Sequence, residues 1–395
     1  MHRPIRSHSP SIATQVSSDG LTRRHFHALL GGAALLGAPA LRAQTGNRIV
    51  LGQSAAFSGP AAQLGIQFHA GAKLFFDQLN ARGGVNQNLV EIRQLDDGYE
   101  PARCAENTRK LLADEVFALF GYIGTPTSLA ALPLATQAQT PFFAPFTGAM
   151  GLRQPFNRMA FHLRASYQDE TALIVRQLTH LGLKKIAVFH QNDAYGKAGL
   201  DGVTLALDAL GLKPVATATV ERNSVDVAQA VRTLTAAQPD AVVQISAYTS
   251  CAAYIRAARK AGYGGTFYNV SFVGTQALAD ELGKEGAGVV VSQVVPSPYS
   301  SSRPIAREFG TAIAEGGNKV QANFSSLEGY MAARLLAEGL RRAGGRPSPE
   351  SLITALESIR DFSLGGFNVS FDRNDHVASK FVELSMLTGD GRVRT

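Results

Sequence analysis

From residue 48 onward, short apolar runs alternate with longer segments of helical periodicity, and this alternation constrains the fold more than any other feature of the chain. The run RIVLGQ at 48–53 is a predicted strand, and 65–82 is a predicted helix that ends at Gly83-Gly84. The pattern continues through 116–145 and restarts over 169–295. Strands that alternate with helices are typical of βαβ units and parallel sheets. We therefore predict an α/β fold with two doubly wound halves.

The composition fits a two-domain globular protein. A chain of 395 residues is too long for one ordinary core, and 45% hydrophobic with 17% charged residues is typical of globular proteins. The net charge of +7 could suggest nucleic-acid binding. However, residues 1–43 carry five Arg and one Asp, a net charge of +4, which leaves +3 for the remainder. These charges form no basic run, so we expect no nucleic-acid partner.

Residues 1–43 are a predicted export signal. Arg23-Arg24 followed by Phe26 is typical of the twin-arginine type, and small residues favour cleavage near Ala43. The apolar stretch 28–41 is too short for a confident membrane span. A general secretory signal or a short N-terminal anchor is the alternative. The predicted location is the periplasm.

The two cysteines and the known catalytic motifs give no sign of a cofactor. Cys104 and Cys251 fall in different halves, and a bridge between halves that move would lock them, so we expect free, buried thiols. No His/Cys pair has metal-ligand spacing, and no G-x-S-x-G, dinucleotide or P-loop motif occurs. Asp96-Asp97 is a paired carboxylate that could suggest catalysis. We predict no cofactor and no enzymatic activity.

Four motifs in one collinear order carry a family resemblance. They are GQSAAFSGPAAQLG at 52–65, NARGG at 80–84, DDGY at 96–99 and GYIGTPTS at 121–128. Over residues 48–390 the chain resembles the branched-chain amino-acid (leucine/isoleucine/valine) periplasmic solute-binding proteins, which feed ABC importers. The resemblance implies a type I periplasmic binding protein, with two β/α lobes joined by a three-strand hinge.

Polar or Pro/Ser-rich segments near 164–168 and 295–302 suggest where the chain crosses between lobes, and the resemblance implies a third crossing near 372–375. The predicted lobes are 44–165 plus 297–372, and 166–296 plus 373–395.

The implied function is that of a monomeric receptor. It would bind a small carboxylate-bearing ligand by hinge closure and deliver it to ABC permease subunits in the inner membrane. The ligand would be a hydrophobic or branched-chain amino acid, or a related aromatic or aliphatic acid. A periplasmic sensor for a signalling partner and an exported enzyme are the alternatives.

The segment 121–128 is the predicted anchor for the ligand's carboxylate. It follows an apolar strand, with Thr125 as the expected N-cap of the next helix and Pro126 at its first position. Free amides at such an end attract a carboxylate, although an ordinary capped helix would show the same residues. The resemblance adds hydroxyl contacts from Thr125 and backbone contacts from Phe146 and Gly148.

The second half supplies the other side of the predicted site. The resemblance places the Tyr195 ring over the ligand and puts a ring contact at Ala247 or Tyr248. Relatives have a carboxylate at the position of Ser271 that pairs with the ligand's ammonium. Here Asp193 or Asp169 could replace it, or the ligand lacks an ammonium. The full predicted set is Leu64, Tyr122, Thr125, Pro126, Thr127, Phe146, Thr147, Gly148, Tyr195, Ala247, Tyr248 and Ser271.

Overall fold

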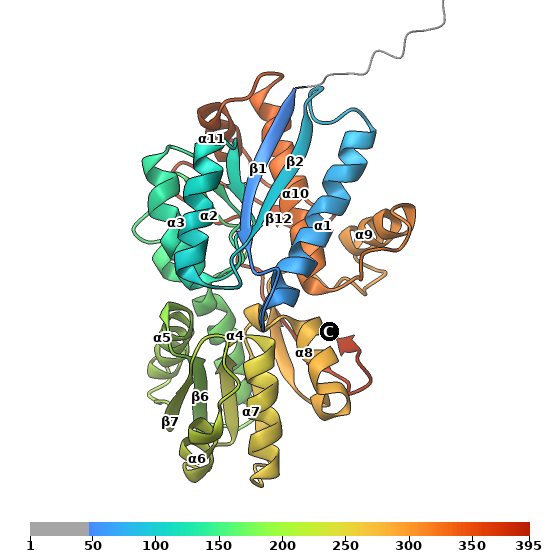
Figure 1. The fold of residues 1–395 in the computed structure, drawn as a ribbon. Coiled ribbons are helices and arrows are strands. Elements are labelled where there is room, and N and C mark those ends of the chain that lie inside the picture. Colours follow the sequence, from blue (N-terminus) through green and yellow to red (C-terminus); the bar gives the residue numbers. More distant parts are fainter. Residues whose placement is uncertain (1–46) are drawn as a thin grey trace, which may run out of the picture. The chain divides into compact units, whose positions relative to one another are not determined.

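The computed structural model describes residues 47–395, so the predicted export signal and its cleavage near Ala43 lie outside the described part. The described residues contain two main sheets, each covered by helices (Figure 1). The predicted α/β class is confirmed.

The first sheet is parallel throughout, with strand order β2-β1-β3-β4-β5. Its strands are β1 Arg48–Ala55, β2 Leu89–Asp96, β3 Ala118–Phe120, β4 Phe142–Phe143 and β5 Ala160–Phe161. The helices that accompany it are α1 Ala62–Ala81, α2 Pro101–Ala113, α3 Thr125–Gln137, α9 Pro304–Glu315, α10 Phe324–Ala343 and α11 Pro349–Glu357. Helix α10 packs along α1 so closely that a Cβ at Gly71 or Gly329 would collide with the backbone of the other helix. We call this sheet with its helices the first lobe.

The second sheet has the order β14-β13-β10-β9-β8-β6-β7, and only the β10–β13 and β13–β14 pairs are antiparallel. Its strands are β6 Ile186–Gln191, β7 Ala216–Val220, β8 Ala241–Ile245, β9 Thr266–Asn269, β10 Val290–Gln293, β13 Glu383–Leu387 and β14 Val393–Arg394. Its helices are α4 Tyr167–His180, α5 Ala194–Asp208, α6 Ala228–Ala236, α7 Tyr248–Lys260 and α8 Thr275–Leu282, with 3-10 turns η2 Ser271–Val273 and η3 Gly283–Gly286. We call this the second lobe.

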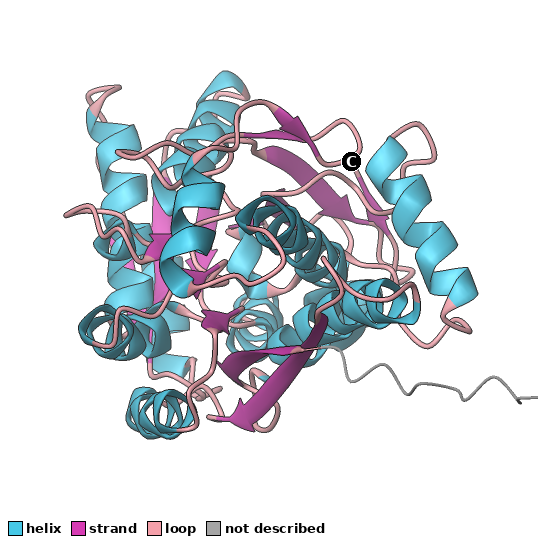
Figure 2. Ribbon diagram, turned by 90° about the horizontal axis from the view of Figure 1, so that it is seen from above, coloured by secondary structure: helices cyan, strands magenta, loops and turns pink. Residues whose placement is uncertain are grey.

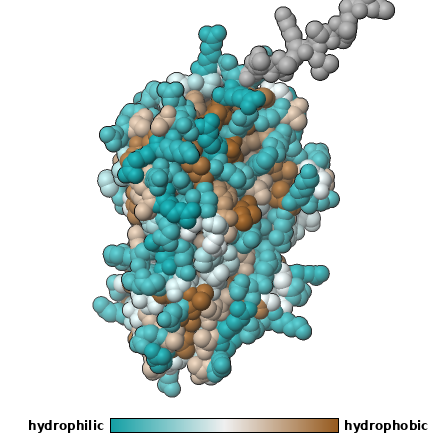
Figure 3. All heavy atoms as spheres, viewed as in Figure 1, coloured by the Kyte–Doolittle hydropathy of each residue, from teal (hydrophilic) through white to brown (hydrophobic). Residues whose placement is uncertain are grey.

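The helices lie on both sides of the strands, as Figure 2 shows from above. The interior strand β8 (AVVQI) is buried at every position, because helices cover both faces of a doubly wound sheet. On the face drawn in Figure 3, hydrophobic residues are scattered among hydrophilic ones. Within residues 47–395, no helix has both the length and the apolar character to cross a membrane.

The chain passes between the two sheets three times, after β5, after β10 and after the short hairpin β11–β12 (Phe362–Ser363 and Asn368–Val369). The first and third crossings run side by side, because His162 and Val377 form a parallel bridge. Their backbone hydrogen bonds are His162 N to His376 O at 2.8 Å and Ala378 N to His162 O at 2.8 Å. The exact lobe boundaries given above remain a prediction.

Two local expectations have clear outcomes. Cys104 and Cys251 are free and buried, as predicted. Thr125, expected to be the N-cap of α3, is instead its first helical residue, and Gly124 is the N-cap. Gly124 has a φ of 97°, and a Cβ there would collide with the Tyr99 ring, so only glycine fits.

Candidate functional site

The hydroxyl groups of two threonines meet at the N-terminus of α3. Thr125 Oγ1 lies 2.6 Å from Thr147 Oγ1, and both residues are buried. Thr127, also in the predicted set, turns its hydroxyl back to Ile123 O and Gly124 O within its own helix end. The Thr125 hydroxyl therefore points away from its own helix, toward Thr147 in the loop after β4. The two hydroxyls lie beside the N-terminus of α3, which is the positive end of the helix dipole.

Aromatic side chains from both lobes converge on the Phe272 ring. Its centroid lies 5.7 Å from that of Tyr99, 5.8 Å from Phe146 and 4.6 Å from Tyr195. Tyr195 also stands 5.3 Å from Tyr167. All five rings are at most 1% exposed. We call these residues the aromatic cluster, and it brings together the predicted Phe146 and Tyr195 from opposite lobes.

Two phenol groups of this cluster are buried without a hydrogen-bond partner among the described residues. They are Tyr167 OH and Tyr195 OH. Burial raises the pKa of Tyr167 to about 12 and that of Tyr195 well above its usual value, so both remain hydroxyl donors at neutral pH. Buried polar groups in proteins are nearly always paired, so both hydroxyls are available to a polar ligand or to a water molecule.

A carboxylate does lie at Ser271, but it comes from an element that the sequence did not indicate. Glu170, in the first turn of α4, accepts hydrogen bonds from Ser271 N at 2.7 Å and Ser271 Oγ at 3.1 Å. Ser292 Oγ also donates to it. Glu170 is fully buried, and this burial raises its pKa. The two substitutes considered from sequence are engaged elsewhere: Asp169 in the capping box of α4 and Asp193 as the N-cap of α5.

A buried ion pair lies beneath Phe146. Arg164 Nε and Nη2 each donate to Glu328 at 2.8 Å, and the guanidinium carbon is 4.0 Å from the Phe146 ring centroid. The third nitrogen, Nη1, has no partner among residues 47–395. A void of about 10 Å³ lies between Arg164, Phe146 and the second-lobe residues Ser271 and Thr275. This is the space of a single water molecule, so side chains leave little room at this point of the cleft.

The other predicted site residues are placed as follows. The Tyr122 ring lies in a separate core cluster, where it packs against Phe142 at 5.0 Å and pairs with Thr108 at 3.1 Å, so it is not among the converging residues. Pro126 is buried in the first turn of α3. Gly148 is approached by the backbone of Tyr167, which would collide with a Cβ.

Of the three remaining predicted residues, Leu64 and Tyr248 have contacts across the lobes. Leu64 belongs to α1 and its side chain contacts Gly274 of the second lobe so closely that a Cβ there would collide with it. Ala247 is the N-cap of α7, and Tyr248 OH accepts a long hydrogen bond, 3.5 Å, from Gln63 N of the first lobe.

Polar contacts along the rim also join the lobes. Arg222 donates to Glu100 of the first lobe at 2.9 Å and to Asp193 of its own lobe at 3.1 Å. Asn223 Nδ2 donates to Glu100 at 2.8 Å and to the Gly98 carbonyl at 3.1 Å. We call Arg222, Asn223 and Glu100 the rim latch.

Asp96 and Asp97, the acidic pair that could have suggested catalysis, have structural roles. Asp96 accepts from Phe57 N and Ser58 N, which fixes the loop after β1, and Asp97 accepts from Ser54 Oγ at 2.7 Å and Tyr99 N at 2.8 Å. Asp97 is buried, and burial raises its pKa to about 6. Among the described residues, no group of three His, Cys, Asp or Glu is placed to hold a metal ion.

Comparisons with known proteins agree with this architecture. A family model described as a periplasmic binding protein matches residues 48–391. The crystal structure of a possible leucine/isoleucine/valine-binding protein from Rhodopirellula baltica is 36% identical, with a TM-score of 0.85 over 88% of this chain and 96% of that chain. A substrate-binding periplasmic protein from Ralstonia solanacearum is 32% identical, with a TM-score of 0.83 over 87% and 99%. The Leu/Ile/Val-binding protein homolog 7 of Brucella suis is 24% identical over 372 residues, which are 89% of this chain and 91% of that protein.

Proposed function

Because the chain belongs to the periplasmic binding protein family, and within it to the leucine/isoleucine/valine-binding type, we propose that it is the extracytoplasmic receptor of an ABC importer. It would bind a small carboxylate-bearing ligand between its lobes, perform no catalysis itself, and present the loaded form to permease subunits in the inner membrane. The observation that carries this proposal is the aromatic cluster, in which buried rings from both lobes surround unpartnered hydroxyls.

The carboxylate of the ligand would dock on the first lobe. The Thr125–Thr147 hydroxyl pair and the N-terminal amides of α3 offer neutral donors and the positive end of a helix dipole. Tyr195 and Phe272 of the second lobe would then close over the ligand, and a ligand that binds both lobes shifts the population toward the closed form. The space that these rings now fill implies that they move apart when a ligand enters.

A ligand ammonium would pair with Glu170. This carboxylate stands at Ser271, is fully buried and has donors from Ser271 and Ser292 that hold it in place. A buried ammonium without an anion is costly, whereas a hydrogen-bonded carboxylate compensates it. An amino acid with an apolar side chain therefore fits the site better than an acid that lacks an ammonium.

The first test is a thermal-shift screen with amino acids, aromatic acids, short aliphatic acids and amides, followed by calorimetry on each hit, since a ligand that binds the folded state raises Tm. L-leucine and 4-methylpentanoate form the decisive pair, because they differ only in the ammonium. We expect Glu170→Gln to weaken the binding of L-leucine while leaving the affinity for 4-methylpentanoate nearly unchanged. Equal losses for both compounds would remove Glu170 from the ammonium site.

The carboxylate anchor is tested separately with Thr125→Val. The matched control is Thr108→Val, which removes an equally buried hydroxyl that pairs with Tyr122 in the core of the same lobe. We expect both variants to lose similar stability, but only Thr125→Val to lose affinity. Unchanged affinity in Thr125→Val would contradict the assignment of this loop as the carboxylate anchor. A screen in which no compound raises Tm would contradict the proposed function.

A further inference from the structure

Tyr99 has a backbone conformation that large side chains rarely adopt. Its φ is 64°, in the left-handed region, and among residues 47–395 no other aromatic residue has a positive φ. A bulky residue in this region persists only where the surrounding structure holds it in place, and such strain gathers at sites where ligands bind or segments move. Tyr99 is fully buried and does not belong to the set predicted from the sequence. It is therefore a candidate for a functional residue that the sequence did not indicate.

Two carboxylates hold the turn that contains Tyr99. Asp96 Oδ1 accepts a hydrogen bond from Gly98 N at 3.0 Å. Asp97 Oδ1 accepts one from Tyr99 N at 2.8 Å, and its other oxygen accepts from Ser54 Oγ. An Asp side chain that bonds to the amide two residues further on is a common way to stabilise such a turn. All these contacts lie within the first lobe, so they hold the turn in open and closed forms alike.

The Tyr99 ring lies against the helix end where the ligand's carboxylate would dock. Gly124, the N-cap of α3, is so close to the ring that a Cβ there would collide with it. The ring centroid also lies 5.7 Å from that of Phe272 in the second lobe. Tyr99 therefore contacts both the proposed carboxylate anchor and the opposite lobe.

The Tyr99 hydroxyl forms a hydrogen bond across the lobes. It accepts from Gln191 Nε2, at the end of β6, at 3.2 Å. The same nitrogen donates to Asp193 Oδ2 at 2.6 Å, which connects the pair to the N-cap of α5. Burial raises the pKa of Tyr99 well above its usual value, so the group is a neutral hydroxyl at neutral pH. This bond is therefore uncharged and enclosed, whereas the ion pair of the rim latch is partly exposed.

The residues on either side of Tyr99 also contact the second lobe. The Gly98 carbonyl accepts from Asn223 Nδ2 at 3.1 Å. Glu100 accepts from Asn223 at 2.8 Å and from Arg222 at 2.9 Å. Three consecutive residues of one first-lobe turn thus pair with the second lobe. Contacts between the lobes stabilise the closed form over the open form, so this turn contributes to closure.

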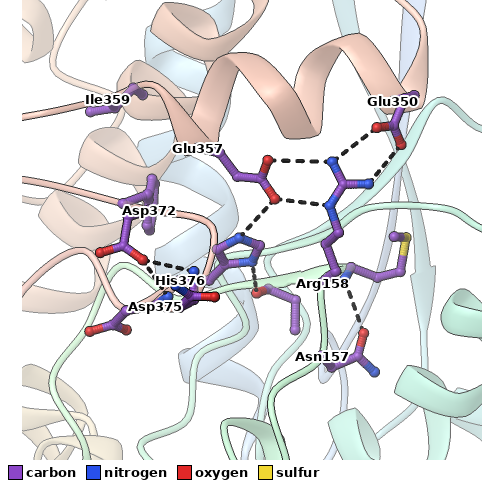
Figure 4. Close-up of polar contacts among 12 residues, drawn as sticks. Asn157, Arg158, Glu350, Glu357, Ile359, Asp372, Asp375 and His376 are labelled. Carbon is purple, nitrogen blue, oxygen red and sulfur yellow. Dashed lines mark hydrogen bonds and ion pairs between the residues drawn. The ribbon is translucent and has the colours of Figure 1, made fainter.

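The charged network near the hinge differs in this respect. There Arg158 pairs with both Glu350 and Glu357, and all three residues belong to the first lobe (Figure 4). Contacts within one lobe are kept in both forms, so they do not change the difference in free energy between them. The contacts of the turn 98–100 do change it.

We propose that Tyr99 is a closure residue, whose hydroxyl pairs with Gln191 when the lobes close and thereby adds to the affinity for the cleft ligand. This inference rests on the proposed function, because the affinity is that of the proposed receptor for its ligand. Tyr99 acts through Gln191, so it is a positioning residue. Because Asp97 and Gly124 fix the ring in advance, little conformational freedom is lost when the bond forms.

The test is a calorimetric titration of the purified protein with L-leucine, or with the strongest hit of the thermal-shift screen if that is another compound. Tyr99→Phe removes only the hydroxyl, and we expect the Kd to rise about fivefold because one neutral hydrogen bond is lost from the closed form. The matched control is Tyr330→Phe, which removes a buried phenol that donates to Glu308 at 3.1 Å within the first lobe. Tyr330→Phe should lower Tm and leave the Kd unchanged.

Gln191→Met completes a double-mutant cycle. We expect Tyr99→Phe to have no further effect on the Kd in the Gln191→Met background, because the partner of the hydroxyl is gone. Independent losses that multiply would mean that the hydroxyl acts on the ligand directly, which refutes the pairing. A Kd in Tyr99→Phe equal to that of the parent chain refutes the closure role and leaves the proposed function standing. If no compound of the screen binds the parent chain, the proposed function fails and the closure role fails with it.

Discussion

The rim latch offers the sharpest test of how the lobes close. Arg222 is 23% exposed and forms one ion pair across the lobes, with Glu100, and one within its own lobe, with Asp193. The substitution Arg222→Gln keeps a polar side chain but removes the charge. The ion pair between Arg222 and Asp193 lies within one lobe, so it stabilises the open and closed forms alike. Only the ion pair with Glu100 changes the difference in free energy between the two forms.

The size of the effect follows from the exposure of this pair. Glu100 is 42% exposed, so the pair is worth less than a buried charged hydrogen bond, about 1.5–3 kcal/mol, and more than most surface pairs, about 0–1 kcal/mol. A loss of about 1 kcal/mol from the closed form corresponds to roughly fivefold in the equilibrium. Asn223 still donates to Glu100 and keeps the loss from being larger. If the free protein is mainly open, the whole factor appears in the apparent Kd.

Calorimetry with a ligand from the thermal-shift screen measures this Kd for the parent chain, Arg222→Gln and the control Arg232→Gln. Arg232 is exposed on α6 and, among residues 47–395, its side chain hydrogen-bonds only to Gln229 of the same helix. We expect a roughly fivefold weaker Kd in Arg222→Gln alone, shrinking at high salt because partly exposed charges are screened. A Kd in Arg222→Gln equal to that of the control would refute the argument that the rim stabilises the closed form.

Three further predictions concern other buried contacts. Burial raises the pKa of Asp97 to about 6, and an unfolded Asp has a pKa of about 3.9, so stability should fall by up to about 3 kcal/mol as pH rises from about 4 to about 6. Asp97→Asn should flatten that decline in urea unfolding. Gly274→Ala should weaken ligand binding, since φ is 78° and the new Cβ would collide with Leu64, and Leu64→Ala should restore part of the loss. Glu328→Gln should lower stability by about 3–5 kcal/mol in thermal unfolding, because Arg164 is left buried and unpaired.

Local pattern was sufficient to predict most elements of the fold. The strand predicted at 48–53 lies within β1, Arg48–Ala55, and the helix predicted at 65–82 overlaps α1, Ala62–Ala81. The two-residue strand β5 was not predicted, since two residues carry no periodicity. The N-cap at α3 was misplaced for a nonlocal reason: the Tyr99 ring demands glycine at 124, while the Thr125 hydroxyl is drawn to Thr147.

The site was less accessible to sequence reasoning because its contacts join distant positions. Glu170 and Ser271 are 101 residues apart, and in sequence Glu170 resembles an ordinary acidic residue in the first turn of a helix. Arg164 and Glu328 are 164 residues apart. A signal for Glu170 did exist, since α4 follows the first crossing and its first turn faces the hinge, but only the sheet order brings it to the end of β9.

The charges inside the cleft bear on the class of ligand more directly than the rings do. Arg164 forms its ion pair with Glu328, whereas Glu170 forms no ion pair among residues 47–395, although the charge of Arg164 also acts on it. The opposite wall, at Thr125 and Thr147, has neutral hydroxyls and a helix N-terminus, which favour negative charge. A ligand with a carboxylate at one end and an ammonium at the other compensates both walls, and a plain acid compensates only one. The balance of buried charge therefore favours a zwitterion with an apolar side chain, which the aromatic cluster would cover.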